Sequence, residues 1–204
     1  MNALFSTTTK LLEKFWHILE HQHVLLVGPV GIGKTTFLTQ FKKYAEEVYG
    51  SDVIFLSDIS SPKPSNKYES LIAKSFRHGD SFLLKEGLLG WRHRFTQSAR
   101  LKVPILIVDG ATGFFYKMSD KGLKEFLHVF RNARMEYEYP RIVLADQDFQ
   151  FLLSDKGIDS SPLNDFVVFE LEPTTYEESL EVLSKSTVLS PELVALISWF
   201  TDGN

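Results

Sequence analysis

The sequence has no cysteine among its 204 residues, no long hydrophobic run and no surplus of positive charge. Without cysteine, disulfides, thiol catalysis and cysteine-bound zinc are excluded. No apolar run approaches the ~20 residues of a membrane-spanning helix, and the N-terminus lacks a secretory pattern. With 22 Lys and Arg against 26 Asp and Glu, the net charge is −4, so only a local basic patch could attract nucleic acid. We therefore expect a cytoplasmic protein with no membrane partner.

The composition is that of a globular protein, with 44% hydrophobic and 24% charged residues. A chain of this length corresponds to about one domain and can bury a core without disulfides. The six His residues are scattered along the sequence, so we do not expect a metal site made only of protein side chains.

Short β-rich runs alternate with longer segments of helical period. The expected strands cover residues 23–27, 53–56, 103–108, 141–145 and 166–171. The expected helices cover residues 4–20, 35–49, 68–77, 83–98, 120–138, 178–185 and 191–200. This alternation is typical of an α/β fold with a mainly parallel sheet and helices on both faces.

The strongest pattern is Gly28-Pro29-Val30-Gly31-Ile32-Gly33-Lys34-Thr35, which fits G-x-x-x-x-G-K-[ST]. It lies between an apolar strand and a helix, the context that favours a phosphate loop over a chance Gly-rich turn. Such a loop presents backbone N–H groups to a phosphate at a helix N-terminus. Lys34 then reaches the β- and γ-phosphates, and the Thr35 hydroxyl binds Mg²⁺. The predicted nucleotide-binding residues of this segment are Gly28, Pro29, Val30, Gly31, Ile32, Gly33, Lys34, Thr35 and Thr36.

A second acidic site follows the apolar run Ile105-Leu106-Ile107-Val108, which ends in Asp109. An Asp at the carboxyl end of a strand beside a phosphate loop can hold the magnesium shell from the opposite side. Taken alone, the pattern also fits an Asp that caps a turn beside Gly110, but the phosphate loop favours the magnesium role. We expect Lys34 and Asp109 to be catalytic, and Thr35 and Asp109 to hold the metal.

The residues after Asp109 argue against fast hydrolysis. They are Gly110-Ala111-Thr112-Gly113, and no carboxylate follows until Asp120. ATP-hydrolysing proteins of this broad class often have a Glu directly after the Asp, or an acidic pair a few residues on, that orients the attacking water. Thr112 can hold a water by hydrogen bonding but is a poor proton acceptor at neutral pH.

With both motifs placed, the chain resembles the AAA+ P-loop ATPases, and more closely the STAND signalling ATPases of NACHT and archaeal type. Three further stretches carry the resemblance. Asp109-Gly110-Ala111 is similar to the NACHT Walker B opening, without its acidic pair. Residues 169–178 are similar to the strand-Pro-Thr-x-x-Glu-Glu entry to the lid helices, and Gly203-Asn204 is similar to the Gly-Asn that ends a lid helix.

The resemblance spans nearly the whole chain and implies a three-layer P-loop fold. Its five-stranded, mainly parallel sheet would have the order 5-1-4-3-2. Residues 1–172 would form the nucleotide-binding core with its N-terminal helix, and residues 173–204 the start of a helical lid. Because relatives continue beyond this point, we expect a truncated lid and an effector or sensor region after residue 204.

The resemblance also implies a polar sensor of the γ-phosphate after the fourth strand, where this chain has Asp146 and Gln147. Only Gln147 can donate a hydrogen bond to phosphate, so Gln147 joins the predicted nucleotide-binding residues. Between Asp146 and Phe166, where ring-forming relatives carry an arginine finger, the chain has no Arg. We therefore do not expect ring-type hydrolysis between subunits, although self-association stays open.

Three functions are compatible with these residues. We expect a domain that binds ATP or ADP with Mg²⁺ as a nucleotide-dependent switch or slow ATPase. The alternatives are a DNA-associated AAA+ ATPase of loader or transposition type, and a catalytically inactive nucleotide-binding scaffold. The basic-aromatic cluster at residues 91–95 can stack on nucleic acid, but an amphipathic helix with Trp91 and Phe95 turned inward explains it as well and is favoured.

Overall fold

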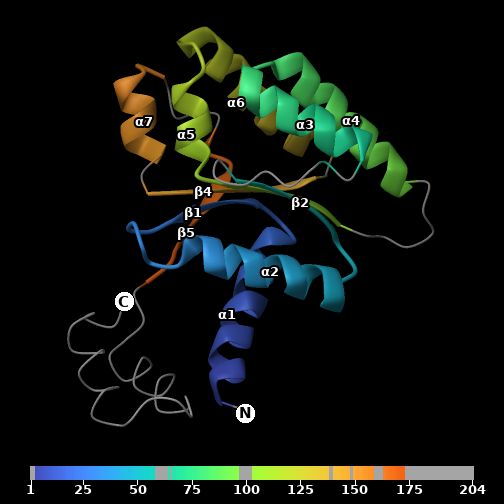
Figure 1. The fold of residues 1–204 in the computed structure, drawn as a ribbon, viewed down its shortest axis with the longest axis vertical. Helices are drawn as coiled ribbons and strands as arrows, with labels where there is room; N and C mark the ends of the chain where they lie inside the picture. The colour runs from blue at the N-terminus through green and yellow to red at the C-terminus, as the bar shows by residue number, and fades with distance from the viewer. Residues whose placement is uncertain are drawn as a thin grey trace.

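The computed structural model describes residues 3–57, 64, 66–96, 103–137, 140–147, 149–158 and 163–172. In this part of the chain, helices cover both faces of a five-stranded sheet (Figure 1). The strands are β1 (His23–Val27), β2 (Asp52–Ser57), β3 (Pro104–Asp109), β4 (Arg141–Asp146) and β5 (Phe166–Glu170). The helices are α1 (Ala3–Leu19), α2 (Lys34–Val48), α3 (Lys67–His78), α4 (Ser81–Thr96), α5 (Ala111–Tyr116), α6 (Asp120–Tyr137) and α7 (Phe149–Asp155).

The strands of the sheet pair in parallel in the order β2-β3-β4-β1-β5. This is the expected order 5-1-4-3-2 read from the other edge, so the predicted three-layer α/β P-loop fold is confirmed. β4 lies between β1 and β3, with Val27 paired to Asp146 and Asp109 paired to Ala145. The carboxyl ends of β1, β3 and β4 are therefore neighbours, at the edge where open α/β sheets bind their ligands.

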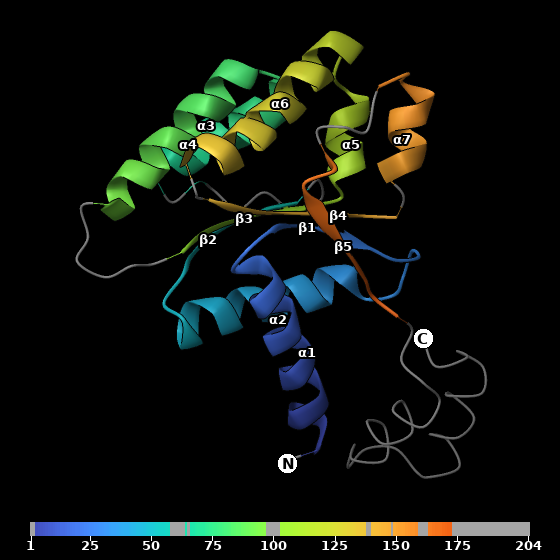
Figure 2. The same cartoon turned by 180° about the vertical axis from the view of Figure 1, so that it is seen from behind.

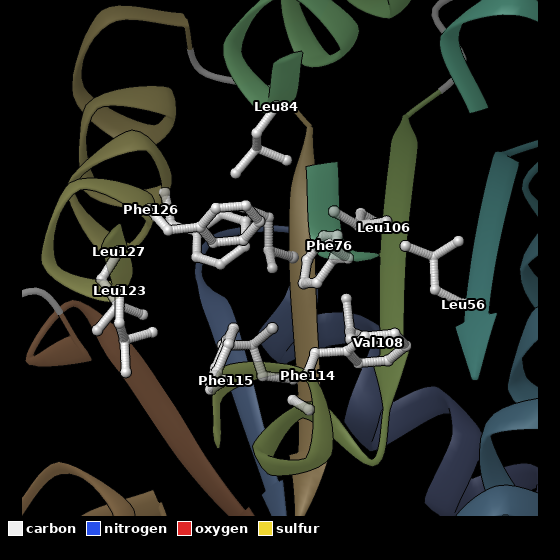
Figure 3. Close-up of a cluster of buried hydrophobic side chains, with 14 of the residues drawn as sticks. Leu56, Phe76, Leu84, Leu106, Val108, Phe114, Phe115, Leu123, Phe126 and Leu127 are labelled. Atoms are coloured by element: carbon white, nitrogen blue, oxygen red, sulfur yellow. The ribbon is translucent and has the colours of Figure 1, made fainter. Parts of the chain in front are cut away.

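The sheet separates two hydrophobic clusters, because successive side chains of a strand point to opposite faces. On β1, Leu25 belongs to one cluster, and Val24 and Leu26 belong to the other. α1 and α2 cover the face of Val24 and Leu26, and α3 to α7 cover the opposite face (Figure 1, Figure 2). Figure 3 shows the cluster on that opposite face, where the ring of Phe76 packs edge-to-face on Phe126 with centroids 4.8 Å apart.

Phe15 is one of the buried residues that fix α1 to the domain, with Leu12, Trp16 and Leu19. The ring of Phe15 packs edge-to-face on Phe37 and Phe41 of α2 and on Phe169 of β5, with centroids 4.7 to 5.1 Å apart. Aromatic pairs of this kind contribute about 0.5–1.5 kcal/mol beyond the burial of their area. These contacts link α2, the helix that follows the phosphate loop, through α1 to the edge strand β5.

The connection between β2 and β3 contains the hairpin of α3 and α4, which pack with little space between them. A Cβ atom at Gly90 of α4 would lie 2.3 Å from the ring of Tyr68 of α3, so glycine permits the close approach. Trp91 is fully buried, and its indole N–H donates to the Asp52 carboxylate at 2.8 Å. The inward orientation of Trp91 is thus confirmed, whereas the side chain of Phe95 lies outside the described residues.

α5 and α7 have no counterpart among the helices expected from the sequence. They contain six and seven residues, too few for a helical period to be visible. The helices expected over residues 178–185 and 191–200, and with them the lid, lie outside the described residues. None of the described helices combines the length and hydrophobicity that a bilayer span requires.

Candidate functional site

The loop between β1 and α2 has a backbone that favours glycine at two positions. Gly31 and Gly33 have φ angles of 81° and 95°, which other residues adopt only with strain. Added Cβ atoms there would meet nothing within 4 Å, so conformation rather than space is the reason. At Gly28, a Cβ atom would lie 3.1 Å from the Leu171 carbonyl oxygen, so the loop begins close against the chain that follows β5.

The first residue of α2, Lys34, turns back over this loop. Its Nζ donates to the carbonyl oxygens of Gly28 at 2.6 Å and Pro29 at 2.8 Å. Burial lowers the pKa of Lys34, and the nearby carboxylates of Asp146 and Asp109 act in the opposite direction. The ammonium group therefore lies where it faces both the loop and two acidic residues.

Thr35 and Asp109 are far apart in sequence but in direct contact. The Thr35 hydroxyl donates to Oδ2 of Asp109 at 2.6 Å. Asp109 ends β3 and is only 8% exposed, with β4 as the one strand between it and β1. The sheet order therefore brings the two predicted metal ligands together.

The pair formed by Thr35 and Asp109 fits a magnesium ion that is shared with a nucleotide. Mg²⁺ takes oxygen ligands, and proteins usually hold it through one or two carboxylates together with substrate phosphates. Within the described residues, no group of three or more His, Asp or Glu side chains could hold a metal by itself. The donor set thus fits Mg²⁺ only when phosphate oxygens complete the coordination.

Asp146 brings a second carboxylate to the same edge of the sheet. Its Oδ2 accepts hydrogen bonds from the Thr112 hydroxyl and from the Thr112 backbone N–H, the latter at 2.8 Å. Its Oδ1 accepts from the backbone N–H of Gln147 at 2.7 Å. The Thr112 hydroxyl is therefore engaged with Asp146, which is 34 residues away, and no motif in the sequence signals this pairing.

The remaining predicted residues surround this group. Pro29 and Val30 form the exposed tip of the loop, with Val30 74% exposed. Ile32 is partly buried against the cluster under α1 and α2. Thr36 and Gln147 are exposed.

Several solved structures share this fold. A Walker-type ATPase of Pyrococcus abyssi has a TM-score of 0.60 and 18% identity over 94% of this chain and 62% of its own. The structure of Aeropyrum pernix ORC1 in complex with DNA has a TM-score of 0.56 and 16% identity, over 97% of this chain and 54% of its own. AMPPCP-bound DnaA from Aquifex aeolicus has a TM-score of 0.54 and 17% identity, over 97% of this chain and 57% of its own. The chain therefore spans only a little more than half the length of such proteins, and identities this low show the fold alone.

The family follows from a separate comparison. No curated protein sequence matches the chain. Residues 18–153, which include the phosphate loop, Asp109 and Asp146, match the model of the AAA domain family. This match covers more than half of the sequence, from the end of α1 into α7. The chain therefore belongs to the AAA domain family and contains a P-loop ATPase domain of the AAA+ type.

Proposed function

We propose that this domain binds ATP or ADP with Mg²⁺ and acts as a nucleotide-dependent switch or slow ATPase of the STAND type. The observation that carries the proposal is the 2.6 Å hydrogen bond between Thr35 and Asp109. It sets a hydroxyl and a carboxylate beside the phosphate loop, where a metal bound to phosphates needs its protein ligands.

In this proposal each residue has a separate task. The backbone N–H groups of the loop bind the β-phosphate, and Lys34 exchanges its loop carbonyls for the β- and γ-phosphate oxygens. Thr35 and Asp109 hold the magnesium ion, which when bound neutralises charge on those oxygens. Gln147, which directly follows β4, would contact the terminal phosphate.

Two features support a switch over a fast enzyme. Asp109 is followed by Gly110 and not by an acidic residue that would orient water. In addition, α5 and α7 directly follow the strands that end in Asp109 and Asp146, and they are tied together at their far ends. There Lys156 donates to the carbonyl oxygen of Met118 at 2.9 Å. In this proposal a displacement at either carboxylate would reach both helices, and the lid expected over residues 173–204 would respond to it.

We expect Asp109→Asn to weaken nucleotide binding by about 10–100-fold in the presence of Mg²⁺, the range seen when metal sites lose a supporting group. Binding measured in EDTA should change little, because the proposed role of Asp109 is limited to the metal. Titration calorimetry under both conditions measures the difference. If Asp109→Asn lowered nucleotide affinity equally with and without Mg²⁺, Asp109 would be a turn residue and not a metal ligand.

A DNA-associated ATPase is the second candidate, and the hairpin of α3 and α4 favours it. Residues 67–96 contain six Lys and Arg against three Asp and Glu, although the whole chain is acidic. Lys74, Arg77 and Lys85 are exposed on this hairpin. A basic surface of this kind is the usual electrostatic footprint of a nucleic-acid partner, and the similar ORC1 structure contains DNA.

If this candidate function holds, duplex DNA should bind more weakly as salt rises. The double variant Lys74→Glu, Arg77→Glu should then lower the slope of log affinity against log salt by about two. The matched control is Lys42→Glu, Lys43→Glu on α2, which makes the same change in net charge on the opposite face of the sheet. Fluorescence anisotropy with a labelled duplex measures the affinity of the wild type and of both double variants. This candidate function would be wrong if the wild type did not bind duplex DNA at low salt, or if both double variants lost affinity for DNA equally.

A further inference from the structure

β5 is an edge strand, with one of its two sides open. In the part of the chain that the structure describes, β5 pairs with β1 alone (Figure 2). Five consecutive residue pairs join the two strands in parallel without a bulge. An open side of this kind presents a row of backbone N–H and C=O groups with which another extended chain can pair.

A hydrogen bond just after β5 shows which backbone groups face the open side. The N–H of Leu171 donates to the carbonyl oxygen of Val27 at 2.9 Å, so Leu171 faces β1. In a parallel pair, the N–H and C=O groups of successive residues face the partner strand and the other side in turn. Phe169 therefore also faces β1, whereas Val168 and Glu170 direct their backbone groups to the open side.

β5 lacks the features by which proteins usually protect an edge. Edge strands are commonly blunted by Lys, by Pro, by a bulge or by a very short length. The sequence of β5 is Phe-Val-Val-Phe-Glu, and five residues is about the commonest strand length. Val168 lies opposite Leu25 of β1, on the face that α3 to α7 cover elsewhere, yet it is 59% exposed. The open side of β5 therefore carries an uncovered apolar side chain.

The surroundings of this edge are acidic. Residues 157–184 contain seven Asp and Glu and no Lys or Arg, and Glu170 and Glu172 are both exposed. Lys14 of α1 approaches β5 from the other face of the sheet, where its Nζ lies 5.7 Å from the ring centroid of Phe169. The charge beside the open side is thus negative, on the face that Val168 shares with Glu170.

We propose that the open side of β5 is the docking site for an extended, basic and apolar segment of a partner protein. The inference goes beyond the nucleotide-dependent function and does not depend on it. The segment adds a strand to the sheet through the backbone groups of Val168 and Glu170. One of its apolar side chains covers Val168, and its Lys or Arg side chains pair with Glu170 and Glu172. A second copy of this chain fits less well, because it would bring two acidic edges together.

The first test uses the whole chain labelled with ¹⁵N and the peptide acetyl-Lys-Val-Lys-Val-Val-Val-Lys-Val-Lys-amide. Its sequence is symmetric, so it can pair in either direction. In the free chain, the amides of Val168 and Glu170 should exchange hydrogen quickly, and that of Phe169 slowly. Saturating peptide should slow the exchange of Val168 and Glu170 about tenfold or more, because a paired amide exchanges only when the pairing opens. The same peptide with Glu in place of Lys is the control and should leave both amides unchanged.

The second test measures the affinity of the labelled Lys peptide for variants by fluorescence anisotropy. Val168→Pro removes an outward N–H but leaves the bonds to β1 in place, so it should weaken binding about tenfold. Val168→Thr keeps this N–H and should bind like the wild type. Glu170→Lys should weaken binding about fivefold and make it less dependent on salt. Glu47→Lys, the same change at an exposed position on α2, should have no effect.

Other results would overturn the inference. Slow exchange of the Val168 and Glu170 amides in the free chain would mean that another part of this chain covers the edge. Failure of the Lys peptide to bind, or equal binding of the Glu peptide, would remove the proposed partner chemistry. Unchanged affinity in both Val168→Pro and Glu170→Lys would place the peptide elsewhere.

Two further controls complete the design. If Val168→Pro does not fold, Glu170→Lys and the exchange measurement decide the question. Self-association of the wild type that is lost in Glu170→Lys, measured by analytical ultracentrifugation, would assign the edge to a second copy and also overturn the inference. Since none of these measurements involves nucleotide, any such failure leaves the proposed function intact.

Discussion

Lys34→Ala is expected to weaken the binding of Mg–ATP by about a hundredfold. The Lys34 ammonium is the cation that the motif supplies to the β- and γ-phosphates, and hydrogen bonds to charged groups contribute about 1.5–3 kcal/mol each. Every ~1.4 kcal/mol is a factor of ten in affinity. In the structure Nζ is already held over the loop by the carbonyl oxygens of Gly28 and Pro29, so the charge needs little movement to reach a phosphate.

The matched control for this experiment is Lys43→Ala. Lys43 lies on the same helix, α2, but is exposed. Lys43→Ala therefore removes the same ammonium group at a position away from the loop. Titration calorimetry with ATP and Mg²⁺ should give the wild-type affinity for this control. Equal affinities of wild type and Lys34→Ala would remove the phosphate-loop assignment.

The second large effect concerns the rate of ATP hydrolysis, which should lie far below the ~1–10³ s⁻¹ turnover of ordinary enzymes. No carboxylate follows Asp109 closely, and the hydroxyl of Thr112 is engaged by Asp146. The Asp146 oxygens already accept three hydrogen bonds, which leaves this carboxylate poorly placed to take a proton from water. No Arg occurs between Asp146 and Phe166, and an arginine finger is worth about 10³–10⁵ in rate where it has been measured.

A steady-state phosphate-release assay measures this rate, with Lys34→Ala as the blank for contaminating activity. Tight binding with no turnover at all would favour the inactive scaffold over the slow ATPase. A rate above ~1 s⁻¹ would show that a residue of this chain orients the water. Asp146→Asn would then be the first variant to assay, since Asp146 is the remaining carboxylate at that edge.

The strands and long helices could be predicted from the sequence because their physical signals are local. β3 is buried along its whole length, and a strand buried on both faces produces the continuous apolar run that marks residues 103–108. All five expected strands are present, with their ends within one residue of those expected. The order of the strands, however, was implied only by the resemblance to AAA+ proteins, since no spacing in the sequence encodes which strands become neighbours.

The candidate site could be predicted only in part, for the same reason. The loop and Asp109 each follow a strand in a recognisable pattern, and the structure places the Thr35 hydroxyl against the Asp109 carboxylate. The bond between Thr112 and Asp146 joins residues that no motif connects, and it depends on β4 lying beside β3. α5 and α7 were missed because they are short and take their positions from those two strand ends.

The place of β4 in the sheet also affects how the chain folds as it is synthesised. β1 is made early, but both strands that pair with it, β4 and β5, are made more than about a hundred residues later. At about 5–20 residues per second, the apolar segment His23–Val27 waits at least several seconds before its first partner is available. During that interval the loop has no sheet to hold it, and Thr35 cannot meet Asp109 in its final position. Nucleotide can therefore stabilise only the completed sheet and cannot assist the early chain, whose unpaired strand is most open to misassembly before residue 146 emerges.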